Sequence, residues 1–274
     1  MLVAAALFAL MGVFVKFGAA HFSSTELVFY RTLIGLTSIG GLAVARGWVL
    51  RSAHWVRHMK RGVVGYFALL LYFYAIAHLP LGTAVTLNYT SPMFLAALSA
   101  ILLHESLSKR VWWSLALGFV GVAVLLKPTL GADQWFAGLV GLLSGAMAGW
   151  AYLHVRELSR LGEPEWRVVF YFSLVSCVGG IIWMGYESQF GVIHSVRWDN
   201  LWILLGLGGT ATLAQLALTR AYAQGQKFVV ASLAYSTVVF STVLGAVLWG
   251  DSLPLSSYLA IGLIMVSGVF ASRR

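Results

Sequence analysis

The chain has 274 residues, of which 60% are hydrophobic and only 10% are charged. Because a soluble domain carries about 25% charged residues, this composition excludes an ordinary soluble protein and indicates one that lies in a lipid bilayer. The net charge of +9 could suggest nucleic-acid binding. The basic residues lie in short loops between apolar runs, however, where they orient membrane helices, so we expect no nucleic-acid partner.

Ten apolar runs are long enough to cross about 30 Å of hydrocarbon. Each is expected to be a helix, because an open sheet edge cannot span a membrane. The first run lacks a basic segment before it and a small-residue cleavage site, so we expect a spanning helix and not a cleavable signal. The expected helices cover approximately Leu2–Ala20, Leu27–Ala45, Gly62–Leu79, Thr83–Leu103, Val111–Leu126, Phe136–His154, Trp166–Tyr186, Asn200–Ala221, Phe228–Trp249 and Ser256–Ala271.

Two stretches of the chain align with each other without a gap. Ala75–Leu107 aligns with Ala221–Leu253, and both end in an acidic residue followed by Ser-Leu. The coinciding pairs include Leu87 with Leu233, Tyr89 with Tyr235, Phe94 with Phe240 and Leu98 with Leu244. An alignment over a whole helix in register indicates a duplicated unit. We predict a first repeat at residues 1–127, a short external linker at 128–135 and a second repeat at 136–274.

The distribution of basic residues predicts the orientation of these helices. With the N-terminus in the cytoplasm, 14 of the 18 lysines and arginines fall inside and only Lys127 and Arg197 fall outside, as the positive-inside rule requires. Five helices per half is an odd number, so the second half must enter the membrane from the opposite face. The predicted fold is an all-α integral membrane protein with ten transmembrane helices in two inverted five-helix repeats. Both termini are cytoplasmic.

The paired helix ends Glu105-Ser106-Leu107 and Asp251-Ser252-Leu253 resemble those of the EamA family of the drug/metabolite transporter superfamily. The run Ala148–Arg156, AGWAYLHVR, which lies in the first helix of the second half, resembles that family as well. The resemblance covers nearly the whole chain and implies the inverted-repeat fold and a transport function. It does not define the substrate, since such proteins carry amino acids, sugars, vitamins, nucleotide-linked metabolites and drugs.

Two cations are predicted to lie inside the spans. Lys16, near the outer end of the first helix, and Arg31, near the outer end of the second, are both expected roughly 6–8 Å below the outer boundary. A charge at the centre of a span costs about 2.5–3.5 kcal/mol and less near the ends, so an intramembrane cation indicates a functional site. The pair favours an anionic substrate, with Arg31 binding it in bidentate fashion. The alternative is that Lys16 extends outward to the interface and Arg31 pairs with Glu26.

A set of aromatic and polar side chains is expected at mid-depth, where a hydroxyl or amide needs a partner and therefore favours a cavity over lipid. Tyr89 and Tyr235, related by the repeat, should face each other. The alternative for such residues is contact between helices or an aromatic belt at the interface. The predicted substrate-binding residues are Lys16, Tyr30, Arg31, Asn88, Tyr89, Trp150, Tyr152, Tyr171 and Tyr235.

Pro92 lies near the middle of the fourth expected helix and removes a backbone hydrogen bond there. It is predicted to mark either a bend used in gating or a static kink. The sequence shows no metal-ligand spacing, phosphate-binding glycine loop or nucleophile motif. No carboxylate falls near the middle of a span, which gives little support to proton coupling. We therefore expect no catalytic residue, no metal and no cofactor.

These observations favour a secondary transporter in the cell membrane, the inner membrane if the source is bacterial. It would move a small anionic or zwitterionic metabolite, such as an amino acid or another organic carboxylate, by alternating access. An integral membrane enzyme acting on lipid-linked substrates and a channel are the alternatives. The expected partners are a small-molecule substrate and membrane lipid. A second copy of the chain, in a homodimer, is a further candidate partner.

Overall fold

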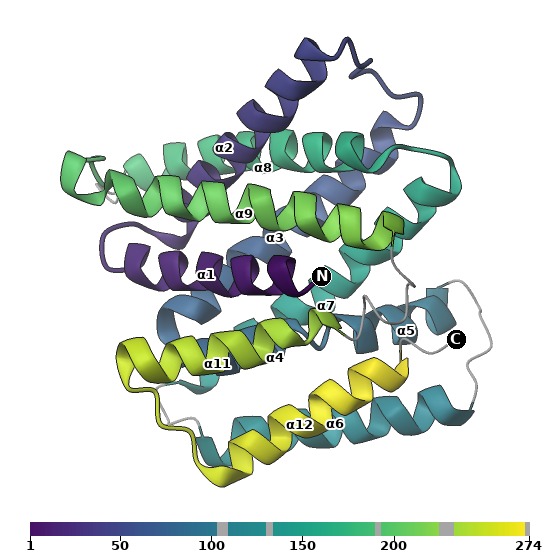
Figure 1. Cartoon of the computed structure of the whole chain (residues 1–274), viewed down its shortest axis with the longest axis vertical. Helices are drawn as coiled ribbons and strands as arrows, with labels where there is room; N and C mark the ends of the chain where they lie inside the picture. The colour runs from purple at the N-terminus through teal and green to yellow at the C-terminus, as the bar shows by residue number, and fades with distance from the viewer. Residues whose placement is uncertain (103–108, 130–133, 190–192, 225–232, 272–274) are drawn as a thin grey trace.

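A computed structural model of the chain describes residues 1–102, 109–129, 134–189, 193–224 and 233–271. The described residues form a bundle of helices, with α1 beginning and α12 ending at the same end of it (Figure 1). We call this the terminal end and the opposite one the distal end. The helices are α1 (Leu2–Gly18), α2 (Ser24–Ala45), α3 (Trp55–His78), α4 (Leu81–Asn88), α5 (Ser91–Leu102), α6 (Lys109–Thr129), α7 (Trp135–Arg160), α8 (Glu165–Ser188), α9 (Trp198–Gln224), α11 (Ser236–Trp249) and α12 (Leu255–Ala271).

Length and hydropathy make this a multi-pass membrane protein. Six segments of the described chain are long and apolar enough to cross a bilayer: α2, α3, α4 with α5, α7, α8 and most of α9. Four shorter apolar segments belong to α1, α6, α11 and α12. Many large apolar side chains on these helices are exposed, as expected for surfaces that face lipid.

The helices pack in pairs that combine the first and second halves of the chain. α1 lies against α9 and α11, whereas α3 lies against α7 and α8. α2 packs on α8 and α9, and α5 packs on α7. α6 and α12 pack along each other at one edge of the bundle, the lower edge in Figure 1. The core lies where α1, α3, α4 and α9 meet, around the fully buried Val15, Phe73, Ile76, Leu87 and Leu207.

The fourth expected span is broken into α4 and α5. α4 ends at Asn88 and α5 begins at Ser91, so the break falls on Tyr89 and Thr90. Pro92 is the second residue of α5, where its missing N–H breaks no helix hydrogen bond. A Cβ at Gly145 or Gly149 of α7 would overlap with backbone atoms next to the break, so these glycines allow α7 to approach it closely.

One helix starts earlier than the apolar pattern predicted. α3 begins at Trp55 and not at Gly62, because its first two turns carry basic side chains that hydropathy assigned to a loop. Arg61 consequently belongs to the helix. Glu105-Ser106-Leu107, residues 130–133 of the predicted linker and Lys227 lie outside the described residues.

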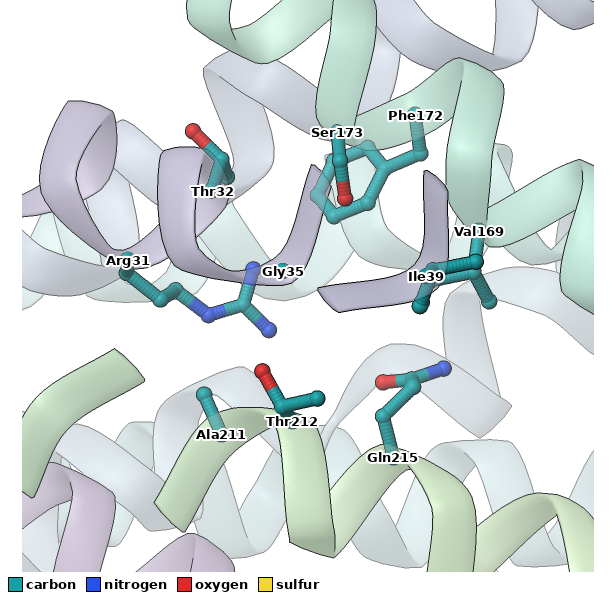
Figure 2. A pocket seen from close by; sticks show the side chains of 10 residues that line it. All are labelled: Arg31, Thr32, Gly35, Ile39, Val169, Phe172, Ser173, Ala211, Thr212 and Gln215. Atoms are coloured by element: carbon teal, nitrogen blue, oxygen red, sulfur yellow. The ribbon is translucent and has the colours of Figure 1, made fainter. Parts of the chain in front are cut away.

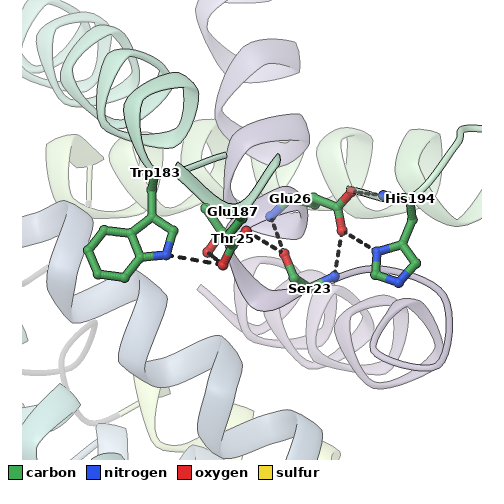
Figure 3. Close-up of polar contacts among 6 residues, drawn as sticks. All are labelled: Ser23, Thr25, Glu26, Trp183, Glu187 and His194. Atoms are coloured by element: carbon green, nitrogen blue, oxygen red, sulfur yellow. Dashed lines mark hydrogen bonds and ion pairs between the residues drawn. The ribbon is translucent and has the colours of Figure 1, made fainter. Parts of the chain in front are cut away.

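Two carboxylates at the distal end join α2 to α8 and to the segment before α9 (Figure 3). Glu187, at the end of α8, accepts hydrogen bonds from Ser23, Thr25 and Trp183 at 3.1–3.3 Å. Glu26, which is fully buried, caps the start of α2 through Ser23 and accepts hydrogen bonds from the backbone N–H and Nδ1 of His194. Arg31 does not pair with Glu26, so the alternative prediction for that arginine is not met.

A third buried carboxylate, Glu163, joins two loops at the terminal end. It accepts a hydrogen bond from Ser52 of the α2–α3 loop and one from Arg167 at 2.9 Å. His58 Nε2 lies 3.3 Å from its Oε2 atom. Burial on its own raises the pKa of this carboxyl group, but the contacts from Ser52, Arg167 and His58 outweigh burial and leave the pKa below its ordinary value.

Candidate functional site

A pocket lies between α2, α8 and α9, and the guanidinium group of Arg31 points into it toward α9 (Figure 2). The wall opposite Arg31 carries a hydroxyl and an amide, from Thr212 and Gln215. Gly35 of α2 faces Ser173 of α8, since a Cβ at Gly35 would be in van der Waals contact with the Ser173 hydroxyl. The complete lining is Arg31, Thr32, Gly35, Ile39, Val169, Phe172, Ser173, Ala211, Thr212 and Gln215.

Arg31 has no acidic partner among the described residues. Its Nε atom is buried without a hydrogen bond, and its guanidinium carbon lies 5.8 Å from the centroid of the Phe172 ring. The titratable groups that interact with it electrostatically include the phenols of Tyr72 and Tyr152, which are neutral at pH 7. A guanidinium group inside a span without a counter-ion is energetically costly. This pocket is therefore suited to bind a carboxylate or phosphate.

Lys16, the second predicted cation, is already paired. Its Nζ atom lies 3.1 Å from Asp251 Oδ2 and donates to the carbonyl oxygen of Leu79 at 3.3 Å. The same ammonium group lies 4.9 Å from the ring of Trp249. Asp251 Oδ2 also accepts the backbone N–H of Leu81 at 3.0 Å. The structure thus places Lys16 at the junction of α1, α4 and α11 and does not bring it together with Arg31.

The two repeat-related tyrosines lie together, as predicted from the alignment. The rings of Tyr89 and Tyr235 are 5.8 Å apart in an edge-to-face arrangement. The hydroxyl of Tyr89 donates to Thr237 at 2.9 Å, and that of Tyr235 donates to the carbonyl oxygen of Tyr89 at 3.3 Å. Tyr235 directly precedes the start of α11, and Tyr89 lies two residues before the start of α5. Asn88, next to the first of them, donates to Ser144 of α7 at 3.1 Å.

The other predicted residues do not line this pocket. Tyr30 packs edge-on against Phe22 and Phe29, and Tyr171 stacks on His58 at 4.5 Å. Trp150 and Tyr152 on α7 are 42% and 47% exposed.

The sequence pattern did not single out the pocket residues Thr212 and Gln215, nor two further residues near Arg31. Phe172 lines the pocket, and the guanidinium carbon of Arg61 lies 4.1 Å from the centroid of the Phe172 ring. Arg61 could have been found from its position directly before the apolar run that starts at Gly62, because a helix often begins before its apolar segment. The signal for Phe172 was weaker, because one phenylalanine on an apolar helix does not stand out.

A helix bundle with a polar, cationic pocket between membrane-length helices defines a class: multi-pass membrane proteins that bind a small molecule within the bundle. Comparison with known proteins gives the family. The profile of the EamA-like transporter family matches residues 1–127. The pseudopaline exporter CntI of Pseudomonas aeruginosa is 33% identical over 268 residues, which cover 97% of this chain and 92% of the exporter.

Other relatives agree with this assignment. An uncharacterized transporter of Helicobacter pylori is 31% identical over 269 residues, covering 96% of this chain and 89% of that protein. A riboflavin transporter of Brucella anthropi is 24% identical over 200 residues, 73% of this chain and 70% of its own. A crystal structure of another protein superposes with a TM-score of 0.65 over 98% of this chain and 94% of that one, at 21% identity. The chain belongs to the EamA-like transporter family of the drug/metabolite transporter superfamily and is a transporter of the cell membrane, not an enzyme.

Proposed function

We propose that this protein is a secondary transporter that moves a small anionic or zwitterionic metabolite by alternating access. The observation that carries the proposal is the Arg31 guanidinium group, which projects into the pocket between α2, α8 and α9 without an acidic partner in the described part of the chain. A carboxylate or phosphate of the substrate supplies the missing counter-charge. Thr212 and Gln215 line the same pocket and offer a hydroxyl and an amide as hydrogen-bond partners for the ligand.

In this mechanism the chain consists of two inverted repeats of five spans each, at residues 1–127 and 136–274, which move relative to each other during transport. The packing supports this division, because the most extensive contacts between the two halves have counterparts when the halves are exchanged. The α1–α9 contact corresponds to α7–α3, α2–α9 to α8–α3, and α1–α11 to α7–α5. The α4–α5 break and the start of α11 likewise meet at repeat-related tyrosines. Such symmetry lets one central site open to either face in turn.

The charge distribution supports a cytoplasmic terminal end, which carries most of the lysines and arginines that lie outside the spans. The distal end is then external, and the Lys16–Asp251 ion pair closes it by joining α1 of the first repeat to the second residue after α11 of the second repeat. In this conformation the substrate reaches the pocket from the cytoplasm. Outward transport is the proposed direction, and the name of the pseudopaline exporter supports it.

Flux into proteoliposomes tests the proposal. The purified chain is reconstituted, and uptake of radiolabelled amino acids and short organic carboxylates is measured as a function of concentration. The expected result is saturable flux of at least one anionic or zwitterionic compound, lost in Arg31→Gln and retained in Arg57→Gln, an exposed arginine on α3. Non-saturating flux would favour a channel. Normal flux by Arg31→Gln would refute the anion site.

A further inference from the structure

Arg61 occupies a position built around its guanidinium group. It lies in α3, two turns from the start of the helix, and its guanidinium carbon is 4.1 Å from the Phe172 centroid. On its other side is Gly65, one turn further along α3. A Cβ at Gly65 would overlap with Arg61 Nη1 and would come within 3.1 Å of the Phe172 ring. The guanidinium group is therefore held between a helix backbone without a side chain and an aromatic ring.

Among the described residues, this second arginine is also without a counter-ion. Its Nε and Nη1 atoms are buried and have no hydrogen-bond partner, and no ion pair to Arg61 occurs in the described part of the chain. The phenol of Tyr152 is its neighbour, as it is for Arg31. A contact with the face of a phenylalanine ring offsets part of the cost of a buried cation but leaves its charge in place.

Phe172 brings the two arginines into one site. The guanidinium carbon of Arg31 is 5.8 Å from the ring centroid and that of Arg61 is 4.1 Å from it, so their separation is no more than these distances combined. The arginines come from neighbouring helices, α2 and α3, and interact with each other electrostatically. The Nη atoms of Arg31 and Nη2 of Arg61 are not among the atoms that are both buried and unpartnered, and no hydrogen bond to them occurs in the described part of the chain. A ligand can therefore bind them.

We propose that Arg31 and Arg61 form a two-cation site around Phe172 and that the substrate carries two negative charges, as a dicarboxylate or a phosphate ester does. This inference rests on the proposed function and specifies its substrate class. In a dicarboxylate, each carboxylate neutralises one guanidinium group. In a phosphate ester, the doubly charged phosphate neutralises both. A monoanion would leave one of two neighbouring, half-buried cations unpaired, which favours the dianion.

Ligand-dependent thermal unfolding of the detergent-purified chain tests the proposal. The probes are dicarboxylates from malonate to adipate and sn-glycerol 3-phosphate, compared with monocarboxylates of the same chain lengths at equal ionic strength and pH 7.5. A ligand that binds only the folded protein raises the unfolding temperature by mass action. The two groups of dianions show whether the acidic groups are carboxylates or a phosphate.

The wild-type protein should be stabilised by at least one dianion and not by its matched monoanion. Arg61→Gln should weaken binding of that dianion by about 10- to 100-fold, the value of one charge-assisted hydrogen bond, and should abolish the preference over the monoanion. Arg61→Lys, which keeps the charge but lacks the planar fork, should bind with intermediate affinity. Arg57→Gln, one turn earlier on α3 and exposed, should match the wild type.

Gly65→Ala adds a test that leaves both charges in place. Its methyl group would displace Arg61 from the Phe172 face, and it should weaken dianion binding while monoanion binding through Arg31 is unaffected.

Three results would overturn the inference. In the first, monoanions and dianions stabilise the protein equally, Arg31→Gln abolishes binding and flux, and Arg61→Gln leaves them unchanged. This result would refute a role for Arg61 in binding, while the proposed transport of an anion through Arg31 would stand. Absence of stabilisation by every dianion would refute the dianion class even if flux of a zwitterion is measured. If neither arginine affects binding or flux, both this inference and the anion site of the proposed function are wrong.

Discussion

The Lys16–Asp251 ion pair gives the sharpest prediction about how the distal end closes. Its atoms are 3.1 Å apart, and the two side chains are only 14% and 16% exposed. At this separation and an effective dielectric constant near 20, the Coulomb attraction is about 5 kcal/mol. Desolvation of both groups opposes it, so the net coupling is smaller. Removing one partner leaves the other charge buried and costs about 3–5 kcal/mol in comparable pairs.

A double-mutant cycle isolates this interaction. Lys16→Met keeps the apolar stem, and Asp251→Asn keeps an oxygen that can accept the Leu81 N–H. The free energy of unfolding, measured by denaturant titration in mixed micelles, should fall for each single variant. The double variant should lose less than the sum, with a coupling energy of about 1–3 kcal/mol. Additivity within about 0.5 kcal/mol would show that the two charges do not stabilise each other and would remove the basis for an ionic closure.

Three further predictions concern other contacts. Because the pKa of the Glu163 carboxyl group is lowered in the folded protein, its contribution to stability is present above pH 4.5, the ordinary pKa, and is lost as the pH falls through the folded-state pKa. The difference in unfolding temperature between the wild type and Glu163→Gln should therefore shrink in acid. A difference that stays constant with pH would contradict this. Gly145→Ala should destabilise by about 1–3 kcal/mol in thermal unfolding, because its methyl group would overlap with a backbone carbonyl of α4, whereas Gly209→Ala, with open space around it, should be neutral or stabilising. Tyr89→Phe removes the hydrogen bond to Thr237 and should cost about 1 kcal/mol in the same assay; an unchanged value would mean that this bond contributes nothing.

The helices were predictable because the bilayer imposes a length and an apolar composition on each span. The meeting of Tyr89 and Tyr235 was predictable as well, because the two residues coincide in the alignment of Ala75–Leu107 with Ala221–Leu253. Arg61 was not, because hydropathy cannot distinguish an arginine in a loop from one on the first turns of a helix. The partner of Lys16 was missed for another reason: Asp251 is 235 residues away, and only the packing of one half on the other brings them together.

Cysteine accessibility tests alternating access most directly and requires no knowledge of the substrate. Cys177 is the only cysteine, so Cys177→Ala provides a background in which Thr212→Cys places one thiol in the pocket. In vesicles of defined orientation, a membrane-impermeant maleimide should modify this thiol from the cytoplasmic side when the Lys16–Asp251 pair is intact, and Asp251→Asn should shift modification toward the external side. Equal modification from both sides with the ion pair intact would contradict the account, because the pocket would then be open to both faces at once.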